Sequence, residues 1–365
     1  MKKRNIAKVA AGGIAVAGVA AGAKLYGSRF KTMASIKQVT RRKDEPFNLY
    51  RMDVRYAYDL DRIIARGVMG DQENIDAILK EAMPLAPVRM EAPQFGCSAF
   101  TLSNGEASLM GRNYDFKLDT SAMMVHCAPA DGYESIGFCA LNNLSADAAT
   151  NPKARFACLA APFTCIDGIN EAGVSIAVLT LDSLPTRQFN GQPVISTPLA
   201  VRLVLDRAST TQEAIGLLES YDMFATSGRD YHFYITDATG DGCVVEYDCD
   251  DANRRLTITP ARSVTNFYAM HADKVAPNQK NGPYGHGRER QMAIEEALSA
   301  APENEPAVTT AWHALQAAAQ DPNPEDITSN TQWSIVFDNE SCTASIATRR
   351  NWNDLHLFDI HGNER

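Results

Sequence analysis

Cys97 lies at the start of a predicted β-hairpin and is the side chain best placed to do chemistry. Two alternating runs flank Asn104-Gly105, the strongest short-range hairpin signal. With these two as the turn residues, Cys97 and Arg112 are expected to be direct cross-strand partners. A guanidinium there favours thiolate over thiol. Asp115, just past the second strand, is expected to hold Arg112 or a free amine.

A nucleophilic cysteine needs a proton acceptor, and the sequence offers no clear histidine base. His232 lies in an alternating strand and is interpreted as a packed or edge residue. Cleavage between Gly96 and Cys97 would free an α-amino group with an ordinary pKa of about 7.7 to 8.0 beside its own sulfur. Gly96 fits this scheme because a side chain there would crowd the scissile peptide. We therefore predict self-cleavage before Cys97.

The same residues resemble a known family. Gly96-Cys97-Ser98, followed by Gly111-Arg112-Asn113-Tyr114-Asp115, is similar to the choloylglycine hydrolase family of N-terminal-nucleophile hydrolases, which has relatives among acid ceramidase and N-acylethanolamine acid amidase. The likeness continues through residues 167–178 and 264–268 and spans roughly Cys97 to Phe358. It implies an α+β fold: a four-layer αββα sandwich of antiparallel sheets covered by helices.

The resemblance also implies roles for matching positions. Cys97 would be the nucleophile, with Arg112 and Asp115 beside it. Asn266, in Val-Thr-Asn, matches the asparagine whose side-chain amide helps to stabilise the oxyanion. Arg288 matches a later active-site arginine.

Two positions in this match correspond less directly to the family pattern. The loop before Arg288 is short, and the alignment can slip to Arg290. Thr180 stands where bile salt hydrolases carry an asparagine, so a hydroxyl takes the place of the amide at the second oxyanion position. Thr180 and Asn113 are assigned to substrate binding.

Periodicity places helices and hairpins in alternating blocks, without βαβ units, which independently favours an α+β architecture. Helices are expected over Asp71–Met83, Pro198–Arg207, a segment that starts with the capping box Thr210-Thr211-Gln212-Glu213, Arg288–Ala300 and Ala307–Ala319.

Three regions are predicted along the chain. Residues 1–23 combine a basic start with an apolar run of about 15 residues and are expected to be an export signal or a weak membrane anchor. Residues 24–96 are interpreted as a linker, up to about Pro46, and a helical propeptide. Residues 97–365 form the amidase domain. The protein is expected to be exported, and either secreted or anchored at the outer face of the cytoplasmic membrane.

Composition excludes other classes of function. The 365 residues carry a net charge of −9 and a basic cluster only at the start, so nucleic acid is excluded as the main partner. None of the eight cysteines forms a Cys-x-x-Cys pair, and no His-Glu-x-x-His or Asp-rich calcium loop occurs. No metal and no cofactor are therefore expected.

The predicted activity is self-processing hydrolysis of linear, non-peptide amides by a cysteine nucleophile. Conjugated bile acids, penicillin V and fatty acyl amides are the candidate small-molecule substrates. Two alternatives stay open: an acyltransferase that passes the acyl group to an amine, and a non-catalytic binding protein on a degenerate amidase fold. Membrane association through residues 6–23 and assembly into a homo-oligomer are also left open.

Overall fold

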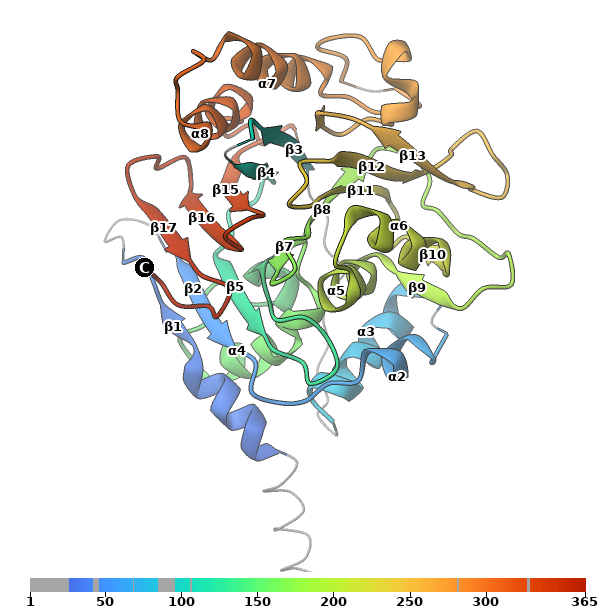
Figure 1. The fold of residues 1–365 in the computed structure, drawn as a ribbon. Helices are drawn as coiled ribbons and strands as arrows, with labels where there is room; N and C mark the ends of the chain where they lie inside the picture. Colours follow the sequence, from blue (N-terminus) through green and yellow to red (C-terminus); the bar gives the residue numbers. More distant parts are fainter. Residues whose placement is uncertain are drawn as a thin grey trace, which may run out of the picture.

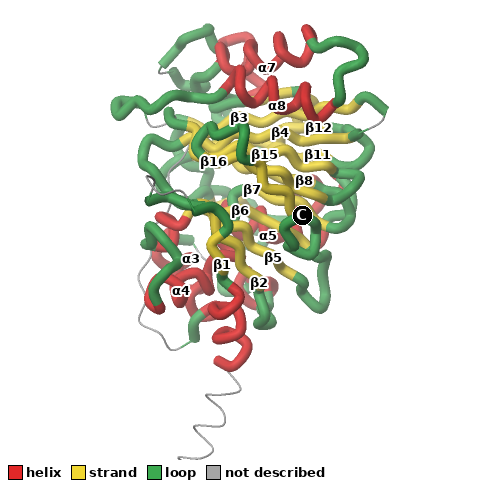
Figure 2. Tube along the Cα trace, turned by 90° about the vertical axis from the view of Figure 1, so that its left-hand side faces the viewer, coloured by secondary structure: helices red, strands yellow, loops and turns green. Residues whose placement is uncertain are grey.

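Two β-sheets lie face to face, and helices cover their outer surfaces, in a computed structural model of the chain (Figure 1). The structure describes residues 26–41, 46–67, 69–84, 96–105, 107–280, 282–326 and 329–365. The predicted export signal, residues 1–23, lies outside these described residues. Viewed from the side, the strands form the middle of the molecule, between helices above and below (Figure 2). The predicted αββα sandwich is confirmed.

Sheet A has nine strands within the described residues, in the order β1-β2-β5-β6-β7-β8-β11-β12-β13. Every neighbouring pair is antiparallel except β2 and β5, which run parallel. The strands are β1 (Lys37–Gln38), β2 (Leu49–Asp53), β5 (Ala122–Cys127), β6 (Ser135–Ala140), β7 (Asp167–Asn170), β8 (Ser175–Leu181), β11 (Asp230–Thr236), β12 (Gly242–Tyr247) and β13 (Leu256–Pro260).

Sheet B is antiparallel throughout and carries Cys97 on its second strand. Its order within the described residues is β14-β3-β4-β15-β16-β17. The strands are β3 (Gly96–Ser103), β4 (Ser108–Asp115), β14 (Ser263–Val264), β15 (Thr331–Asp338), β16 (Thr343–Thr348) and β17 (Leu355–Phe358). A short parallel pair, β9 (Val194–Ser196) and β10 (Asp222–Phe224), lies outside both sheets.

Two helix pairs form the outer layers, as the alternating blocks of the sequence predicted. Helices α5 (Thr197–Arg207) and α6 (Thr211–Glu219) cover sheet A, and α7 (Arg288–Ala300) and α8 (Ala307–Ala318) cover sheet B. The N-cap half of the capping box is confirmed, because Thr210 Oγ1 accepts a hydrogen bond of 3.1 Å from the backbone N–H of Glu213. Glu213 itself accepts from the backbone N–H of Ser209 at 2.9 Å. The remaining elements are α2 (Leu60–Ile64), α3 (Asp71–Ala82), α4 (Pro152–Ala157) and the 3₁₀ segments η1 (Leu141–Leu144), η2 (Cys158–Phe163) and η3 (Ala269–Lys274).

The described residues before Cys97 are part of the fold. The predicted helix over Asp71–Met83 is confirmed as α3, which is tied to the body by a 2.7 Å hydrogen bond between Ser196 Oγ and Asn74 Oδ1. The linker prediction, up to about Pro46, is wrong where the structure describes it: residues 26–35 are helical, and β1 lies in sheet A. Beyond the predicted linker, β2 extends the same sheet. The sequence did not indicate β2, because this strand is only five residues long and shows no sustained period.

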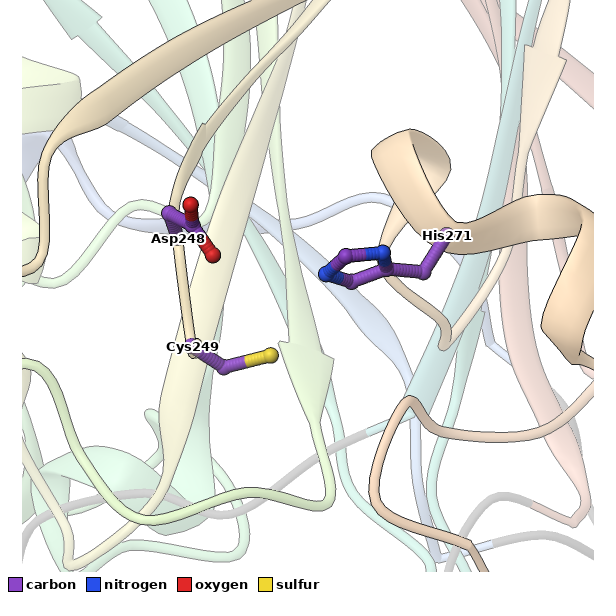
Figure 3. A group of neighbouring side chains, drawn as sticks. All are labelled: Asp248, Cys249 and His271. Carbon is purple, nitrogen blue, oxygen red and sulfur yellow. The ribbon is translucent and has the colours of Figure 1, made fainter. Parts of the chain in front are cut away.

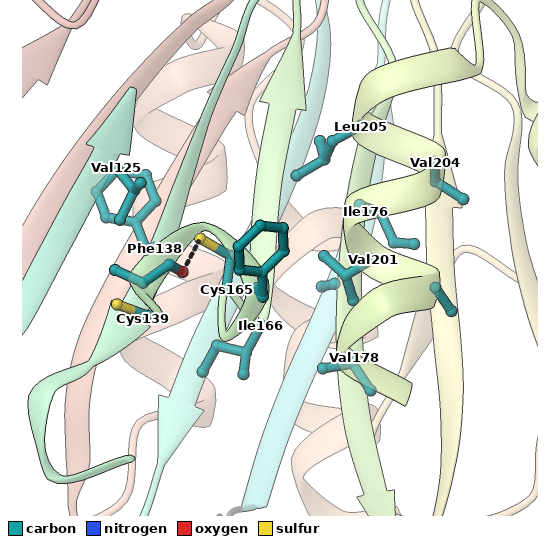
Figure 4. Packing of buried hydrophobic residues seen from close by; sticks show 14 of the residues in the cluster. Val125, Phe138, Cys139, Cys165, Ile166, Ile176, Val178, Val201, Val204 and Leu205 are labelled. Atoms are coloured by element: carbon teal, nitrogen blue, oxygen red, sulfur yellow. Dashed lines mark hydrogen bonds between the residues drawn. The ribbon is translucent and has the colours of Figure 1, made fainter. Parts of the chain in front are cut away.

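The apolar core fills the space between the sheets and continues beneath α5. Val201, Val204 and Leu205 of α5 face Ile176 and Val178 of β8 (Figure 4). A second apolar cluster, which includes Phe100 and Trp312, lies between sheet B and helices α7 and α8. Burial of these surfaces stabilises the sandwich and holds β3 rigidly between the two layers.

Candidate active site

The hairpin that carries Cys97 has a longer turn than the sequence suggested. Cys97 pairs with Tyr114, and Ala99 pairs with Arg112, so the predicted direct pairing of Cys97 with Arg112 is wrong. The connection spans residues 104–107, closed by a 3.4 Å hydrogen bond from Asn104 N–H to the carbonyl of Ala107. Because the register shift is two residues, Arg112 keeps its place on the same face of the sheet as Cys97.

Arg112 and Cys97 meet at one backbone carbonyl of the opposite sheet. Arg112 Nη2 donates to the carbonyl oxygen of Val178 at 3.2 Å, and Cys97 Sγ lies 3.6 Å from the same oxygen. Both side chains are fully buried. Burial raises the pKa of the Cys97 thiol to about 12, although the charge of Arg112 acts in the opposite direction. In this structure the sulfur is therefore protonated, with the Arg112 guanidinium beside it.

Asp167, at the start of β7, holds Arg112 from the other side. Its Oδ2 lies 2.7 Å from Arg112 Nε, and both groups are fully buried. Burial raises the pKa of Asp167 to about 6, against the lowering effect of the Arg112 charge. This aspartate lies within the family likeness of residues 167–178 but was assigned no role, because no local pattern shows that β7 begins beside β4.

Asn266 and Arg290 contact the backbone of Cys97, one at its N–H and the other at its carbonyl. Cys97 N–H donates to Asn266 Oδ1 at 3.1 Å, and the Asn266 amide donates to the carbonyl of Thr180 at 2.8 Å. Arg290 donates to Asn266 Oδ1 at 2.7 Å and to the carbonyl of Cys97 at 3.0 Å. The asparagine thus touches the atom that becomes the terminal amine if the chain is cut before Cys97.

Asp115 is fully buried and pairs with Arg290 rather than with Arg112. Its Oδ2 lies 3.3 Å from Arg290 Nη1, and its Oδ1 accepts a 2.6 Å hydrogen bond from Thr331. Burial raises the pKa of Asp115, with Arg290 as the largest opposing influence. The expectation that Asp115 would hold Arg112 is therefore replaced by a chain of contacts in which Arg290 links Asp115 to Cys97.

The arginine that reaches the site is Arg290, the alternative in the sequence analysis, and Arg288 does not reach it. Arg288 is the first residue of α7, and its guanidinium contacts Gln291 and lies over the Phe267 ring, 5.7 Å from the centroid. Two residues further along the helix, the side chain turns by about 200° around the axis, which directs Arg290 inward. The structure thus corrects the assignment of Arg288.

The two side chains assigned to substrate binding have different surroundings. Asn113 faces the helical layer, away from Cys97: its amide donates to the carbonyl of Leu315 at 2.9 Å, and its oxygen accepts from Ser334 at 2.5 Å. This placement corrects the expectation for Asn113. Thr180 is buried beside Asn266, but its contact uses the backbone carbonyl, and its hydroxyl makes no hydrogen bond.

A cavity of about 650 Å³ opens next to these residues. Arg290 lies in its wall together with Asp182, Arg229 and His286. Asp182 is ion-paired with Arg229 and lies 3.0 Å from His286 Nδ1, which lowers the pKa of this carboxyl. Arg290 therefore has one face on the cavity and one hydrogen bond to the backbone of Cys97, so the cavity is adjacent to the sulfur-bearing residue.

Comparison with known proteins bears on the family and on the fold. Residues 97–254 match the model of the linear amide C-N hydrolases, choloylglycine hydrolase family. A search of curated proteins found no match. The fold resembles penicillin V acylase from Agrobacterium tumefaciens, with a TM-score of 0.52 and 17% identity over 72% of this chain and 86% of that one.

Two mutants of the conjugated bile acid hydrolase from Clostridium perfringens share the fold as well. Their TM-scores are 0.52 and 0.53 at 16% and 17% identity, over 73% of this chain and 95% of theirs. At such identities the likeness shows the fold, which is that of the N-terminal-nucleophile hydrolases. The family match adds the reaction class: the protein is a hydrolase of carbon–nitrogen bonds in linear amides. Residues 97–254 are the part of the chain that matches the choloylglycine hydrolase family.

Proposed function

We propose that the protein is a self-processing amidase whose nucleophile is the Cys97 sulfur. The observation that supports this most is the position of Cys97 itself, with its backbone N–H on Asn266 and its sulfur beside the Arg112 guanidinium. A purely structural cysteine needs neither contact, since free thiols pack as small apolar groups.

Self-cleavage is the first step of the proposal. The Cys97 sulfur attacks the Gly96 carbonyl carbon, the carbon–nitrogen bond breaks, and the nitrogen takes up the thiol proton. Water then hydrolyses the thioester, leaving the Gly96 carboxylate and a free α-amine on Cys97. Arg290 holds the carbonyl of Cys97 at 3.0 Å, which fixes the residue on the far side of the bond that breaks.

Substrate hydrolysis uses the same attack of the Cys97 sulfur on an amide carbonyl, after cleavage has opened the site to water. The α-amine accepts the thiol proton, the thiolate attacks the amide carbonyl, and the leaving amine receives the proton. Asn266 supplies a side-chain N–H for the developing oxyanion, in place of its present bond to Thr180. Water then releases the acid from the acyl-enzyme. Arg112, held by Asp167, lowers the thiol pKa once cleavage lets water reach the sulfur.

The mature N-terminus tests the self-cleavage step. We expect the purified wild-type chain to begin at Cys97 and Cys97→Ala to remain uncut. Cys243→Ala removes another buried thiol and should be processed normally. Intact-mass measurement and N-terminal sequencing give the answer. An active wild-type enzyme that begins upstream of Cys97 would overturn the proposal.

The substrate is proposed to be a small N-acyl amide with a polar end. The cavity beside Arg290 carries cations and carboxylates together, including Arg229, Lys280, Glu289 and Asp326. Such a wall favours a hydrogen-bonding group over a bare hydrocarbon chain. Kinetics with taurine-conjugated, phenoxyacetyl and long-chain ethanolamide substrates, with and without an added amine, will identify the acyl group and separate hydrolysis from transfer.

We propose that the whole chain has the three predicted regions, residues 1–23, 24–96 and 97–365, and that the protein is exported. Its support is the sequence of residues 1–23, a basic start followed by an apolar run. None of the helices in the described parts of the chain has the length and apolar character that a bilayer crossing requires. Fusion of residues 1–23 to a reporter that is active only outside the cytoplasm tests export. A fusion that stays inside the cell would refute it.

A further inference from the structure

Away from Cys97, three metal-ligating side chains converge on one point at the end of β12. Asp248 and Cys249 follow this strand directly, and His271 projects toward them from η3 (Figure 3). One ligand atom from each of the three lies within 4.8 Å of the others. The group joins two segments 22 residues apart in sequence, so no short motif could have revealed it.

His271 supplies the observation that points to a ligand. The side chain is buried, with 8% of its surface exposed, and Nε2 is aimed at Asp248 and Cys249. Within the described residues this nitrogen makes no hydrogen bond, and Asp250 Oδ2, at 3.4 Å, is an ion-pair contact only when the histidine is protonated. A buried polar atom without a hydrogen bond costs free energy, and coordination of a metal ion would remove that cost.

The donor set selects the kind of metal. Thiolate, imidazole and carboxylate together suit a divalent transition metal of borderline softness, whereas Ca²⁺ and Mg²⁺ prefer oxygen ligands alone. Tetrahedral zinc keeps its ligands about 3.5 Å apart, so the present spacing has to close by about 1 Å. Asp248 and Cys249 are half-buried at a turn. One carboxylate oxygen of Asp248 accepts from Asp250 N–H at 2.9 Å, which leaves its second oxygen for a metal ion.

We propose that Asp248, Cys249 and His271 form a zinc site that clamps η3 to the end of β12. Asp250 adds a negative charge beside it, and Lys274 lies 3.8 Å from Asp250 and offsets that charge. The Asp248 carboxylate and the Cys249 thiolate then supply two negative charges, which balance the charge of Zn²⁺. Binding therefore releases the thiol proton: Cys249–SH and Zn²⁺ give a sulfur–zinc bond and H⁺.

The clamp would act on the segment that carries Asn266. Only Phe267 and Tyr268 separate this residue from η3. The backbone N–H groups of Ala269 and Met270 already bond to the buried Glu246 carboxylate at 2.9 and 2.6 Å. A metal at His271 adds a second attachment to the same short segment. The expected role is thus structural, and it does not depend on the proposed reaction.

Metal binding is measured on the full chain. After loading with Zn²⁺ and gel filtration, elemental analysis should give close to one zinc per chain. Titration with Co²⁺ should produce a sulfur-to-cobalt charge-transfer band in the near ultraviolet, which reports thiolate ligation. Cys249→Ser should abolish the band, and His271→Gln should weaken binding on the order of 100-fold.

Matched variants exclude the other thiols and histidines. Cys342→Ser removes a second half-buried cysteine, Cys97→Ala removes the proposed nucleophile, and His313→Gln removes an exposed histidine; all three should keep one zinc and the cobalt band. Zinc far below one per chain, or a band that persists in Cys249→Ser, would overturn the proposal. A protein that fails self-cleavage but binds zinc normally would refute only the proposed function.

Discussion

Arg290 and Arg288 lie two residues apart on one helix but are expected to differ sharply in importance. Arg290 is 4% exposed and bridges three groups: the carbonyl of Cys97, the Asp115 carboxylate and Asn266 Oδ1. In Arg290→Lys the positive charge remains, but a single ammonium cannot reproduce the planar fork that reaches all three. Asn266 then loses a 2.7 Å charge-assisted hydrogen bond, worth about 1.5–3 kcal/mol.

The effect on rate follows from the role proposed for Asn266. Loss of one well-placed oxyanion donor costs about 100-fold or more in kcat. We expect Arg290→Lys to lower kcat about 100-fold and to change KM little, because the lost interaction acts mainly in the transition state. In Arg288→Lys the new side chain can still reach Gln291 and Phe267, so kcat should stay within about twofold of the wild-type value.

Steady-state kinetics on chains shown to start at Cys97 provide the assay, with thermal unfolding as the check on folding. Arg290→Lys is preferred to Arg290→Ala, because removal of the charge would leave Asp115 buried and unpaired at a cost of about 3–5 kcal/mol. The reasoning is refuted if a folded, processed Arg290→Lys keeps more than half of the wild-type kcat, or if Arg288→Lys loses as much.

Three other substitutions test separate parts of the structure. Burial raises the pKa of Asp167 to about 6, so this carboxyl loses its charge as the pH falls below 6. We expect kcat/KM to fall more steeply below pH 6 in wild type than in Asp167→Asn. Equal slopes in the two pH–rate profiles would contradict the Arg112–Asp167 pairing. Met52 of β2 is fully buried, so Met52→Ala should lower the free energy of unfolding by about 2–5 kcal/mol in urea titrations. Half-exposed Met69→Ala should not, and equal effects would argue against burial of Met52. Gly173 has φ +83°, and a Cβ there would lie 2.3 Å from the carbonyl of Asn339, so Gly173→Ala should cost about 1–3 kcal/mol. Gly216→Ala, in open space on helix α6, should be neutral or stabilising by calorimetry.

The sequence predicted the architecture well because its signals are local. Helices with apolar periodicity and a capping box appeared where expected, and so did the antiparallel hairpins. The register of the first hairpin was missed because Asn104 Oδ1 accepts from Ala107 N–H at 3.2 Å and extends the turn. The face of Arg112 was still correct, because strand periodicity is two and the error was two residues.

What the sequence could not show depends on contacts between distant segments. Asp167 is important only because β7 begins beside Arg112, which lies 55 residues earlier in the chain. Arg288 and Arg290 could not be separated from spacing alone, since the direction of each side chain is set by where α7 begins. The parallel β2–β5 pair joins residues on opposite sides of the predicted cleavage point, and no local pattern indicates such a pair.

That parallel pair has a consequence for the molecularity of folding. Strand β2 lies between β1 and β5 inside sheet A, and all eight cysteines are unpaired, so no disulfide joins the described segments on either side of Gly96. Once the proposed cut is made, recovery from denaturant becomes an encounter between two separate chains, and its rate depends on protein concentration. The uncut Cys97→Ala chain, in contrast, refolds at a rate independent of dilution, so the cleavage that activates the enzyme also makes its unfolding difficult to reverse.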